Sequence, residues 1–394
     1  MSLASPAASP SVANDAPEPS PLERVRLQPF NLGLFLPIQN GGWSISTLPR
    51  STDWRFDYNA RLTLQAEALG FDLVFGLAQW MPKGGYGGAS NYRETSLDSF
   101  MATAALSAIT RRILLISTIH VLYGPWHPLH LAKFGATLDH ISGGRWGVNL
   151  VTGHIAAEAR MFGQEREEHD ARYTRAAEFV DMLERLWRTD GNVSIEGRHW
   201  QLHDAYVSPR PLHGRPILIN ATGSKAGFEF GARYSDFVFI PSPTGVDIEA
   251  TLAALPAFTA GLKAAAQAQG RSVRAIINPT IVSAATDALA QARYARILAS
   301  EDAEAVANFN ARFNTQTGAS DARAWSHHVR RPGERAVGGN IHLVGSPQRI
   351  VDDMVRLRDA GCGGVQLTFF DFEPDLAHFG RHILPLMREA GLRL

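Results

Sequence analysis

Hydrogen-bonding side chains follow several apolar runs of the sequence, at the points where those runs end. In the stretch SGGRWGVNLVTG, residues 142–153, an apolar run that begins at Trp146 finishes with Asn149, Thr152 and Gly153. Similar polar positions follow other apolar runs, namely Gln39 and Asn40, Gln79, Thr118 and His120, and Asn220 with Thr222. Each could simply begin a solvated loop. Together they indicate a functional site, provided that the runs are parallel strands that end on one face.

A second chemical signal lies in ILINATGSKAGFEF, residues 217–230, where an apolar strand leads through Thr222-Gly223-Ser224 directly into a helix. The free N–H groups and the dipole of a helix N-terminus bind anions. A hydroxyl at Ser224 suits a phosphate, although serine is also an ordinary N-cap. The helix HDARYTRAAEFVDMLERLW carries Arg172, Tyr173 and Arg175 in its first turns. These side chains could complete a phosphate site or form a solvated basic face.

Other chemistry finds little support in the sequence. The histidine pairs, His127 with His130 and His327 with His328, have no Cys pair and no acidic residue at helical spacing to complete a metal site, so we expect no metal. Cys362 lies in a glycine-rich turn before a strand and is expected to be a small buried residue. Nucleophile-elbow, P-loop and strand-linked G-x-G-x-x-G motifs are absent, which leaves no recognisable cradle for NAD(P)H.

The elements that must position these residues follow one repeated pattern. Three stretches run from amphipathic helix through glycine to apolar strand, with Gly70, Gly143-Gly144 and Gly361 as the helix-ending glycines. Counting the other apolar runs, we expect strands at 32–38, 73–77, 113–119, 146–151, 216–221, 237–240, 275–282 and 365–369. Apolar strands that alternate with amphipathic helices predict a parallel sheet covered by helices. Eight such units predict an α/β protein with a (β/α)₈ TIM barrel, and a doubly wound open sheet is the alternative.

Three segments fall outside this alternation. Residues 1–28 are rich in Ser, Ala and Pro without an apolar period, and we expect a disordered tail before a single barrel domain at 29–394. The stretch VSIEGRHWQLHDAYVSP predicts a hairpin around Gly197. The polar, turn-rich residues 299–339 predict an active-site lid, or else a disordered segment.

The composition limits the class of protein. Lys plus Arg and Asp plus Glu both number 38, so the chain has no electrostatic footprint for nucleic acid or an anionic membrane. The single cysteine excludes an internal disulfide and favours a reducing compartment. The sequence contains no secretory signal pattern and no apolar stretch of about 20 residues, so we expect a cytoplasmic protein.

The motifs LPIQNGGWSIS, SGGRWGVNLVTG, EHDARYTRAAEFVDMLERLW and GVQLTFFDF resemble those of the bacterial luciferase-like flavin monooxygenases. Within that family, the branch with pyrimidine, dimethylsulfone and alkanesulfonate monooxygenases is the most similar, over about residues 30–390. The resemblance implies a barrel that uses O₂ and FMN, as FMNH₂ from a separate NAD(P)H:flavin reductase. It implies flavin contacts from Ala78, Gln79, Asn149, Glu158, Arg172, Tyr173 and Ser224. The last three would hold the phosphate, and Thr118 with Asn149 would hydrogen-bond at the reactive edge of the flavin as catalytic residues.

The substrate is less well indicated than the cofactor. Gln79 and Gly41 depart from the pyrimidine enzymes, which have Lys and Asn there, whereas STDWRFDYN, GGYGG and GPW are more similar to the sulfone enzymes. Expected substrate contacts are Trp43, His120 and His154. Because few charged side chains follow the strands, we expect a small neutral or weakly charged organosulfur compound, a sulfone before an alkanesulfonate.

Three further functions stay open at this point. They are ring-opening oxygenation of a pyrimidine or other cyclic amide, a deazaflavin-dependent dehydrogenase on the same barrel, and a flavin-binding protein without catalysis. We also expect a homo-oligomer.

Overall fold

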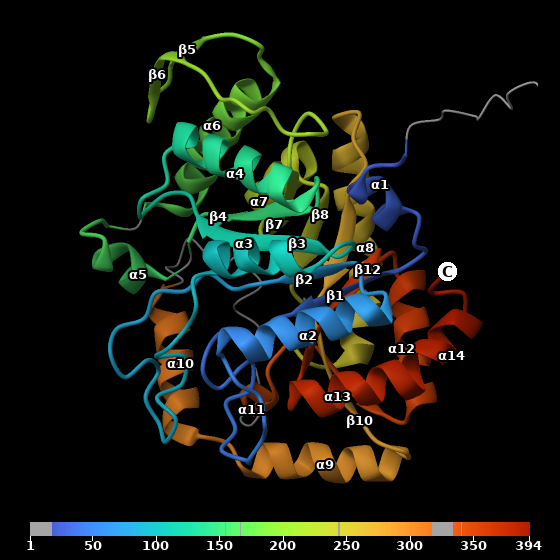
Figure 1. The fold of residues 1–394 in the computed structure, drawn as a ribbon. Coiled ribbons are helices and arrows are strands. Elements are labelled where there is room, and N and C mark those ends of the chain that lie inside the picture. Colours follow the sequence, from blue (N-terminus) through green and yellow to red (C-terminus); the bar gives the residue numbers. More distant parts are fainter. Residues whose placement is uncertain (1–17, 154, 166, 243–244, 317–333, 340) are drawn as a thin grey trace, which may run out of the picture.

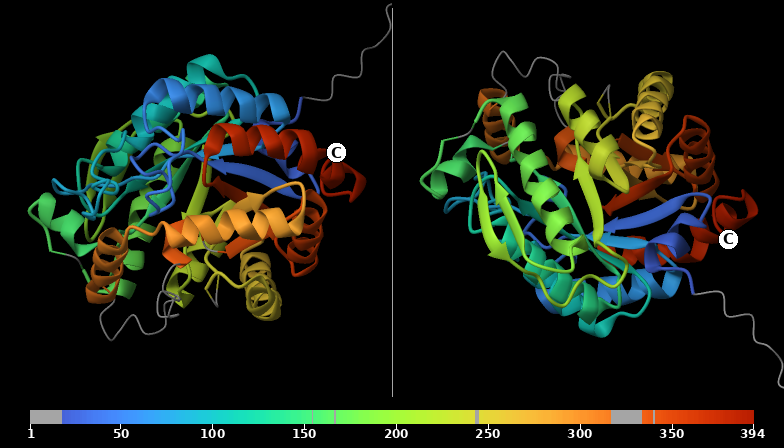
Figure 2. Two further views of the ribbon diagram at one scale, coloured as in Figure 1. Left: turned by 90° about the horizontal axis from the view of Figure 1, so that it is seen from below. Right: turned by 90° about the horizontal axis from the view of Figure 1, so that it is seen from above.

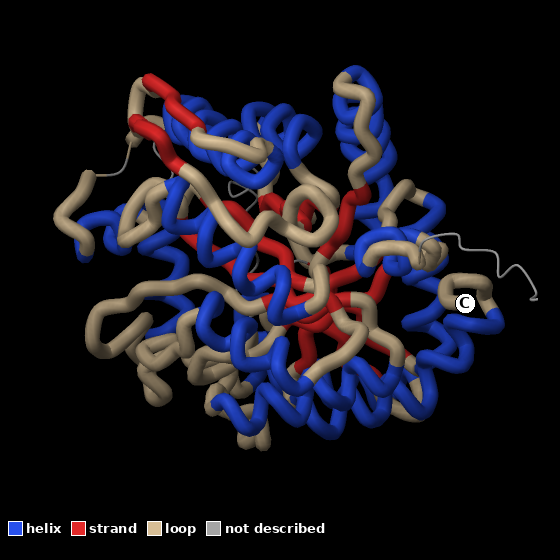
Figure 3. The backbone as a smooth tube through the Cα atoms, turned by 45° about the horizontal axis from the view of Figure 1, so that its top comes forward, coloured by secondary structure: helices blue, strands red, loops and turns tan. Residues whose placement is uncertain are grey.

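The computed structural model describes residues 18–153, 155–165, 167–242, 245–316, 334–339 and 341–394. Within this part of the chain, eight parallel strands form a closed barrel, in which β12 pairs again with β1. In spatial order these strands are β1(Asn31–Phe35), β2(Leu73–Phe75), β3(Leu114–His120), β4(Trp146–Val151), β7(Ile217–Ala221), β8(Phe237–Ile240), β9(Arg274–Ile277) and β12(Gly364–Phe369). Figures 2 and 3 show the strands at the centre, with helices around them. The predicted (β/α)₈ barrel is confirmed.

The helices cover the outside of the barrel. In chain order they are α1(Pro21–Arg26), α2(Phe56–Leu69), α3(Ser99–Ile109), α4(Pro128–Ser142), α5(Ala156–Met161), α6(His169–Arg188), α7(Lys225–Tyr234), α8(Ile248–Ala268), α9(Asp287–Ala299), α10(Ala303–Gln316), α11(Glu334–Val337), α12(Pro347–Asp359), α13(Phe372–His378) and α14(Leu384–Glu389), with a π-helical turn at Phe379–Ile383. Gly70, Gly143 and Gly361 follow helices with φ of +83°, +65° and +93°, as the helix-glycine-strand pattern predicts. Among the described residues, no helix is both long and apolar enough to span a membrane.

The barrel strands are apolar on both faces, and this explains their continuous hydrophobic runs. On β2, Leu73 and Phe75 belong to the cluster that fills the barrel with Leu114 and Ile116 of β3. The residue between them, Val74, belongs instead to the cluster shared with the covering helices. Successive side chains of a strand point to opposite faces, so a strand buried on both sides is apolar along most of its length.

The expected strand 275–282 is divided in the structure. It splits at Asn278 into β9 and β10(Pro279–Ser283), because Pro279 has no N–H group with which to continue the ladder. A parallel strand that was not predicted, β11(Ile341–Gly345), pairs with β10 along its whole length. Its apolar run is only a few residues long and directly follows the polar segment, so it gives a weak signal.

The hairpin is confirmed, whereas the segment expected to form a lid contains helices. Strands β5(Val193–Glu196) and β6(Gln201–Ala205) are antiparallel around Gly197 and lie at the periphery of the molecule (Figure 1). Residues 299–339 are not one polar loop, because α10 and α11 form within them. The apolar face of α10, with Val306 and Phe309, packs in one cluster with Tyr86. Residues 317–333 lie outside the described residues, so the lid stays a prediction.

The disordered tail predicted at residues 1–28 is too long, because a helix begins within it. Residues 1–17 lie outside the described residues, but 21–26 form α1, whose N-cap Ser20 and Glu23 make a reciprocal capping box. Val25 of this helix is buried in the cluster inside the barrel. The spacing of Ser20 and Glu23 is the sequence signature that would have shown the helix, and Val25 explains why the helix closes the amino-terminal end of the barrel.

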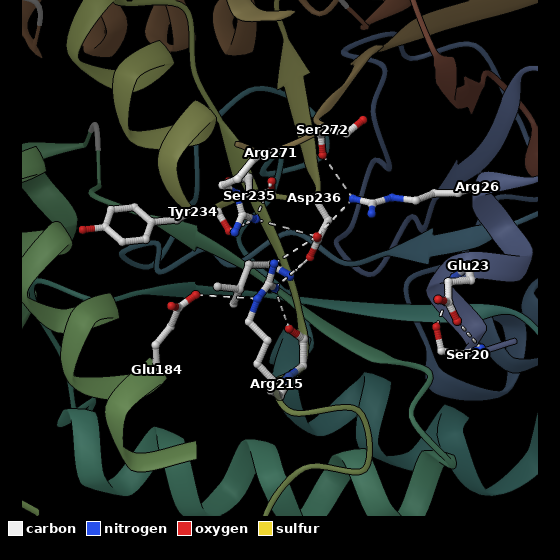
Figure 4. A network of polar contacts seen from close by, with 12 residues as sticks. Ser20, Glu23, Arg26, Glu184, Arg215, Tyr234, Ser235, Asp236, Arg271 and Ser272 are labelled. Carbon is white, nitrogen blue, oxygen red and sulfur yellow. Dashed lines mark hydrogen bonds and ion pairs between the residues drawn. The ribbon is translucent and has the colours of Figure 1, made fainter. Parts of the chain in front are cut away.

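Buried ion pairs surround this amino-terminal end. Asp236, directly before β8, accepts hydrogen bonds from Arg26 at 3.1 Å and from Arg215 at 2.8 and 3.0 Å (Figure 4). Arg271 lies 3.9 Å from the same carboxylate. Directly before β2, Asp72 pairs with Arg393 at 2.6 Å, and both side chains are buried. The network joins α1 and the end of the described chain to the barrel.

We predict that Asp236→Ala destabilises the fold strongly. The substitution leaves the Arg26 and Arg215 guanidinium groups without their shared counterion, and breaking a buried pair from one side costs about 3–5 kcal/mol. Urea denaturation of the variant measures the loss. Glu373→Ala is the matched control, since Glu373 pairs with Arg61 at the surface, and it is expected to cost less than about 1 kcal/mol. Equal losses for the two variants would contradict the prediction.

Candidate active site

Thr118 and Asn149 lie side by side on neighbouring barrel strands. β3 and β4 pair in register at these two residues, and Asn149 Nδ2 donates a hydrogen bond to Thr118 Oγ1 at 3.2 Å. Both side chains are buried, with exposed fractions of 3% and 1%. Within the described chain, Asn149 Oδ1 is buried without a hydrogen-bond donor. A buried acceptor of this kind costs free energy unless a ligand supplies the donor, so this position suits a ligand with an N–H group.

A buried carboxyl group lies close to the end of β3. Glu158, on the short helix α5, is 1% exposed and accepts hydrogen bonds from Tyr123 Oη at 2.6 Å and from the Trp80 backbone N–H at 3.1 Å. His120 Nε2 lies 3.6 Å from the same carboxyl group. Burial raises the pKa of Glu158 to about 7, although the hydrogen bond from Tyr123 and the charge of Arg93 act in the opposite direction. Near neutral pH this carboxyl can therefore hold or release a proton.

The predicted anion-binding residues converge at the N-terminus of α7. Ser224 is its N-cap and accepts a hydrogen bond from the Gly227 N–H at 3.2 Å. Tyr173 Oη lies 3.1 Å from Thr222 Oγ1. A Cβ atom at Gly227 would collide with both of these hydroxyl groups, so only glycine allows this close approach. Hydroxyl groups and a helix N-terminus together form a surface that suits an anion.

Arg172 joins this end of the site to the loop after β4. Its guanidinium group donates to the Gly153 carbonyl, and the side chain is 4% exposed. Gly153 has a φ of +72°, and a Cβ atom there would collide with Tyr123. The arginine, Gly153 and Tyr123 thus connect the anion-binding end to the Glu158 carboxyl group. A buried guanidinium group is a donor that suits a phosphate.

Residues after β1 and β2 form the other side of the site. Gln79, which follows half-buried Ala78, donates to the Arg93 carbonyl at 3.0 Å and accepts from Arg93 Nη1 at 3.3 Å. Trp43 lies under the same guanidinium group, with 4.7 Å between Arg93 Cζ and the ring centroid. The two loops therefore meet at Arg93.

The structure places Thr118, His120 and Asn149 near the carboxyl ends of β3 and β4. Other predicted residues lie in the loops after strands, namely Trp43 after β1, Ala78 and Gln79 after β2, and Ser224 after β7. Glu158 lies on α5, and Arg172 and Tyr173 lie on α6. His154 lies outside the described residues. Sequence reasoning missed Tyr123 and Arg93, which lie in glycine-rich or polar loops without periodicity. Cys362 is 3% exposed, as expected, and burial raises the pKa of its thiol to about 12. The arrangement can hold an anion at α7 and a flat, hydrogen-bonding ring near Asn149.

The comparisons with known proteins agree with this geometry. The model of the luciferase-like monooxygenase family matches residues 30–363, and the chain belongs to this family. It is 32% identical to the FMNH₂-dependent dimethylsulfone monooxygenase of Pseudomonas putida over 92% of this chain and 96% of that protein. It is 34% identical to the pyrimidine monooxygenase RutA of Allorhizobium ampelinum over 92% of this chain and 97% of that protein. The family predicted from the motifs is confirmed.

Solved structures support the same fold. A riboflavin lyase (RcaE) superposes with a TM-score of 0.78 at 23% identity, over 93% of this chain and 92% of that one. DmoA from Hyphomicrobium sulfonivorans superposes with a TM-score of 0.77 at 21% identity, over 92% of this chain and 89% of that one. At these identities the likeness establishes the barrel fold.

We predict a pH-dependent stability that Glu158→Gln removes. Between the ordinary pKa of 4.5 and the folded pKa of about 7, the folded protein keeps a proton that the unfolded chain releases. This stabilisation is fully present below about pH 4.5 and is lost as the pH rises through about 7. Relative to the parent protein, the free energy of unfolding of Glu158→Gln should therefore increase by up to about 3 kcal/mol across this range.

Urea denaturation at a series of pH values tests this. Glu229→Gln, a change in an exposed side chain, is the control and should show no such trend. A difference between Glu158→Gln and the parent that stays constant with pH would show that folding does not raise the pKa of Glu158.

Proposed function

We propose that the protein is the oxygenating component of a two-component FMNH₂- and O₂-dependent monooxygenase that acts on a small sulfone or alkanesulfonate. The observation that carries the proposal is the anion-binding end at α7, where Tyr173, Thr222 and Ser224 meet within the same barrel mouth as the Thr118–Asn149 pair. The anion-binding end at α7 would suit the phosphate of FMN, and the Thr118–Asn149 pair would suit its ring. The name of the dimethylsulfone relative supports the same cofactor and substrate class.

Each group of residues has a separate role in this proposal. Arg172, Tyr173 and Ser224 bind the FMN phosphate, and Asn149 Oδ1 accepts a hydrogen bond from the flavin ring while Thr118 orients the Asn149 amide. Ala78 and Gln79 would contact the ring, and Glu158 would hold a proton in the same site. Bound reduced flavin supplies the chemistry that activates O₂. Trp43 and His120 line the substrate side, where low exposure limits the entry of water.

The partner in this proposal is a separate NAD(P)H:flavin reductase. The sequence has no recognisable dinucleotide cradle, and the dimethylsulfone relative is named for its dependence on FMNH₂. Homo-oligomer formation, a cytoplasmic location and closure by residues 299–339 stay predictions.

Oxygenation of a pyrimidine ring is the second candidate function. It is favoured by the similarity to relatives named pyrimidine monooxygenase, which are as similar to this chain as the sulfone enzymes are. We rank the pyrimidine function second because Gln79 and Gly41 differ from the residues of the pyrimidine enzymes at these positions.

We predict that Arg172→Ala weakens FMN binding by roughly 1.5–3 kcal/mol, the range for a hydrogen bond to a charged group. Riboflavin has no phosphate, so its affinity should hardly change. Calorimetry with both ligands measures the difference. Arg175→Ala is the matched control on the same helix, since Arg175 pairs with Glu167 and stacks on Trp200. Equal losses for FMN and riboflavin would refute the phosphate assignment.

We predict O₂-dependent product from an organosulfur substrate in the reconstituted system. Dimethyl sulfone, a short alkanesulfonate and uracil are offered at equal concentration with FMN, a flavin reductase and NADH. Product from uracil alone would favour the pyrimidine function. Turnover only with a deazaflavin would identify a dehydrogenase, and FMN binding without any O₂-dependent product would indicate a flavin-binding protein.

A further inference from the structure

Arg93 is a buried cation at the mouth of the barrel. Arg93 is only 9% exposed. Nε donates to Tyr92 Oη at 3.0 Å, and Nη1 donates to Gln79 Oε1 at 3.3 Å. Both partners are neutral. Among the residues that the structure describes, no carboxylate lies within ion-pair distance of Arg93, in contrast to Arg215 and Arg393, which each pair with a buried aspartate.

Aromatic rings enclose the guanidinium group. Its Cζ lies 4.7 Å from the ring centroid of Trp43, 5.1 Å from that of Tyr92 and 5.9 Å from that of Phe309. Ring faces attract a cation, but they supply no negative charge and they displace water. A cation held in such a place favours an anion that can enter.

The backbone that carries Arg93 is fixed in an uncommon conformation. Arg93 and Asn91 have backbone φ angles of +61° and +45°, a region that residues other than glycine rarely adopt. Asn40 holds this turn, since its Nδ2 donates to the Asn91 carbonyl at 3.1 Å and its backbone carbonyl accepts from the Arg93 N–H at 3.2 Å. Strain of this kind persists where the surroundings enforce it, and it gathers at ligand sites. Here it orients the guanidinium group.

The position of Arg93 connects it to the rest of the site. It contacts Gln79 and Trp43, and its charge acts on the Glu158 carboxyl group. Because burial keeps the pKa of Glu158 near 7, that carboxyl does not neutralise Arg93 in mildly acidic solution. The other titratable groups that face Glu158 are Tyr123 and His120, and neither supplies a negative charge there. In mildly acidic solution the barrel mouth thus keeps an uncompensated positive charge.

We propose that Arg93 is a specificity-determining residue that binds the anionic oxygens of the substrate, such as the head group of a short alkanesulfonate or carboxylate. The proposal rests on the function proposed above and narrows its substrate class. A guanidinium group donates to two oxygens of such a head group at once. The short apolar remainder of the substrate would lie against the neighbouring aromatic rings. The sequence favoured a neutral sulfone because few charged side chains follow the strands, and Arg93 supplies a buried cation there.

The test compares ligands of nearly equal size on the protein loaded with oxidised FMN. Methanesulfonate and dimethyl sulfone differ by one charged oxygen in place of a methyl group, and acetate distinguishes a carboxylate from a sulfonate. Binding is measured by calorimetry and by quenching of tryptophan fluorescence. We expect methanesulfonate or acetate to bind at least about tenfold more tightly than dimethyl sulfone.

Variants assign this preference to Arg93. We expect Arg93→Met to weaken binding of the anion about 10- to 100-fold, as loss of charge-assisted hydrogen bonds implies, while dimethyl sulfone affinity stays within about twofold. Arg93→Lys keeps the charge and should retain part of the affinity for the anion. This variant also tests the inference if Arg93→Met fails to fold. Arg55→Met is the control, because Arg55 is exposed and pairs with Asp53.

The outcomes separate this inference from the proposed function. If the parent protein binds FMN and oxidises dimethyl sulfone or uracil but shows no preference for anions, the role of Arg93 is refuted and the monooxygenase stands. If Arg93→Met loses FMN and anion affinity equally, Arg93 serves the flavin and the inference is wrong. If the parent protein does not bind FMN, the proposed function itself fails.

Discussion

Closure of the sheet between β1 and β12 is the constraint on which the rest of the structure depends. Once Leu32 lies opposite Val365, every barrel strand has neighbours on both sides, and all carboxyl ends lie on one face. The strands are then buried by the barrel interior and by the helices, so their side chains are mostly apolar and a ligand can reach polar groups at the strand ends. Thr118 and Asn149 occupy such positions, and this is why residues far apart in the sequence gather in one site.

Buried charged and polar groups are paired differently at the two ends of the barrel. At the amino-terminal end, Asp236 and Asp72 are each paired with arginine, so burial of these charges is compensated within the protein. At the carboxyl end, Asn149 Oδ1 has no donor within the described residues, and Arg93 has only neutral partners there. The first arrangement stabilises the fold. The second leaves hydrogen-bonding capacity and charge for a ligand.

Much of the fold could be predicted from the sequence, because strongly periodic segments carry their own signal. Gly70 and Gly361 marked helix ends that the structure confirms. The polar residues Gln79 and Thr118, expected after apolar runs, lie after β2 and near the end of β3. Pro279 was a sequence signal for the division of one strand at Asn278. The extra strand β11 could not be predicted, since pairing with β10 decides it. Arg93 could not be predicted because its turn has no hydrophobic periodicity, and only the folded chain brings it next to Trp43.

The barrel also has a consequence for synthesis of the chain. β1 pairs with β12, whose residues follow some 330 positions later, and Arg393 reaches back to Asp72 and to the Phe30 carbonyl. While the ribosome is still translating the middle of the chain, one edge of β1 has no partner and the barrel stays open. An open edge of this kind can pair with other chains. A nascent polypeptide of this architecture therefore exposes an open sheet edge until its last strand emerges.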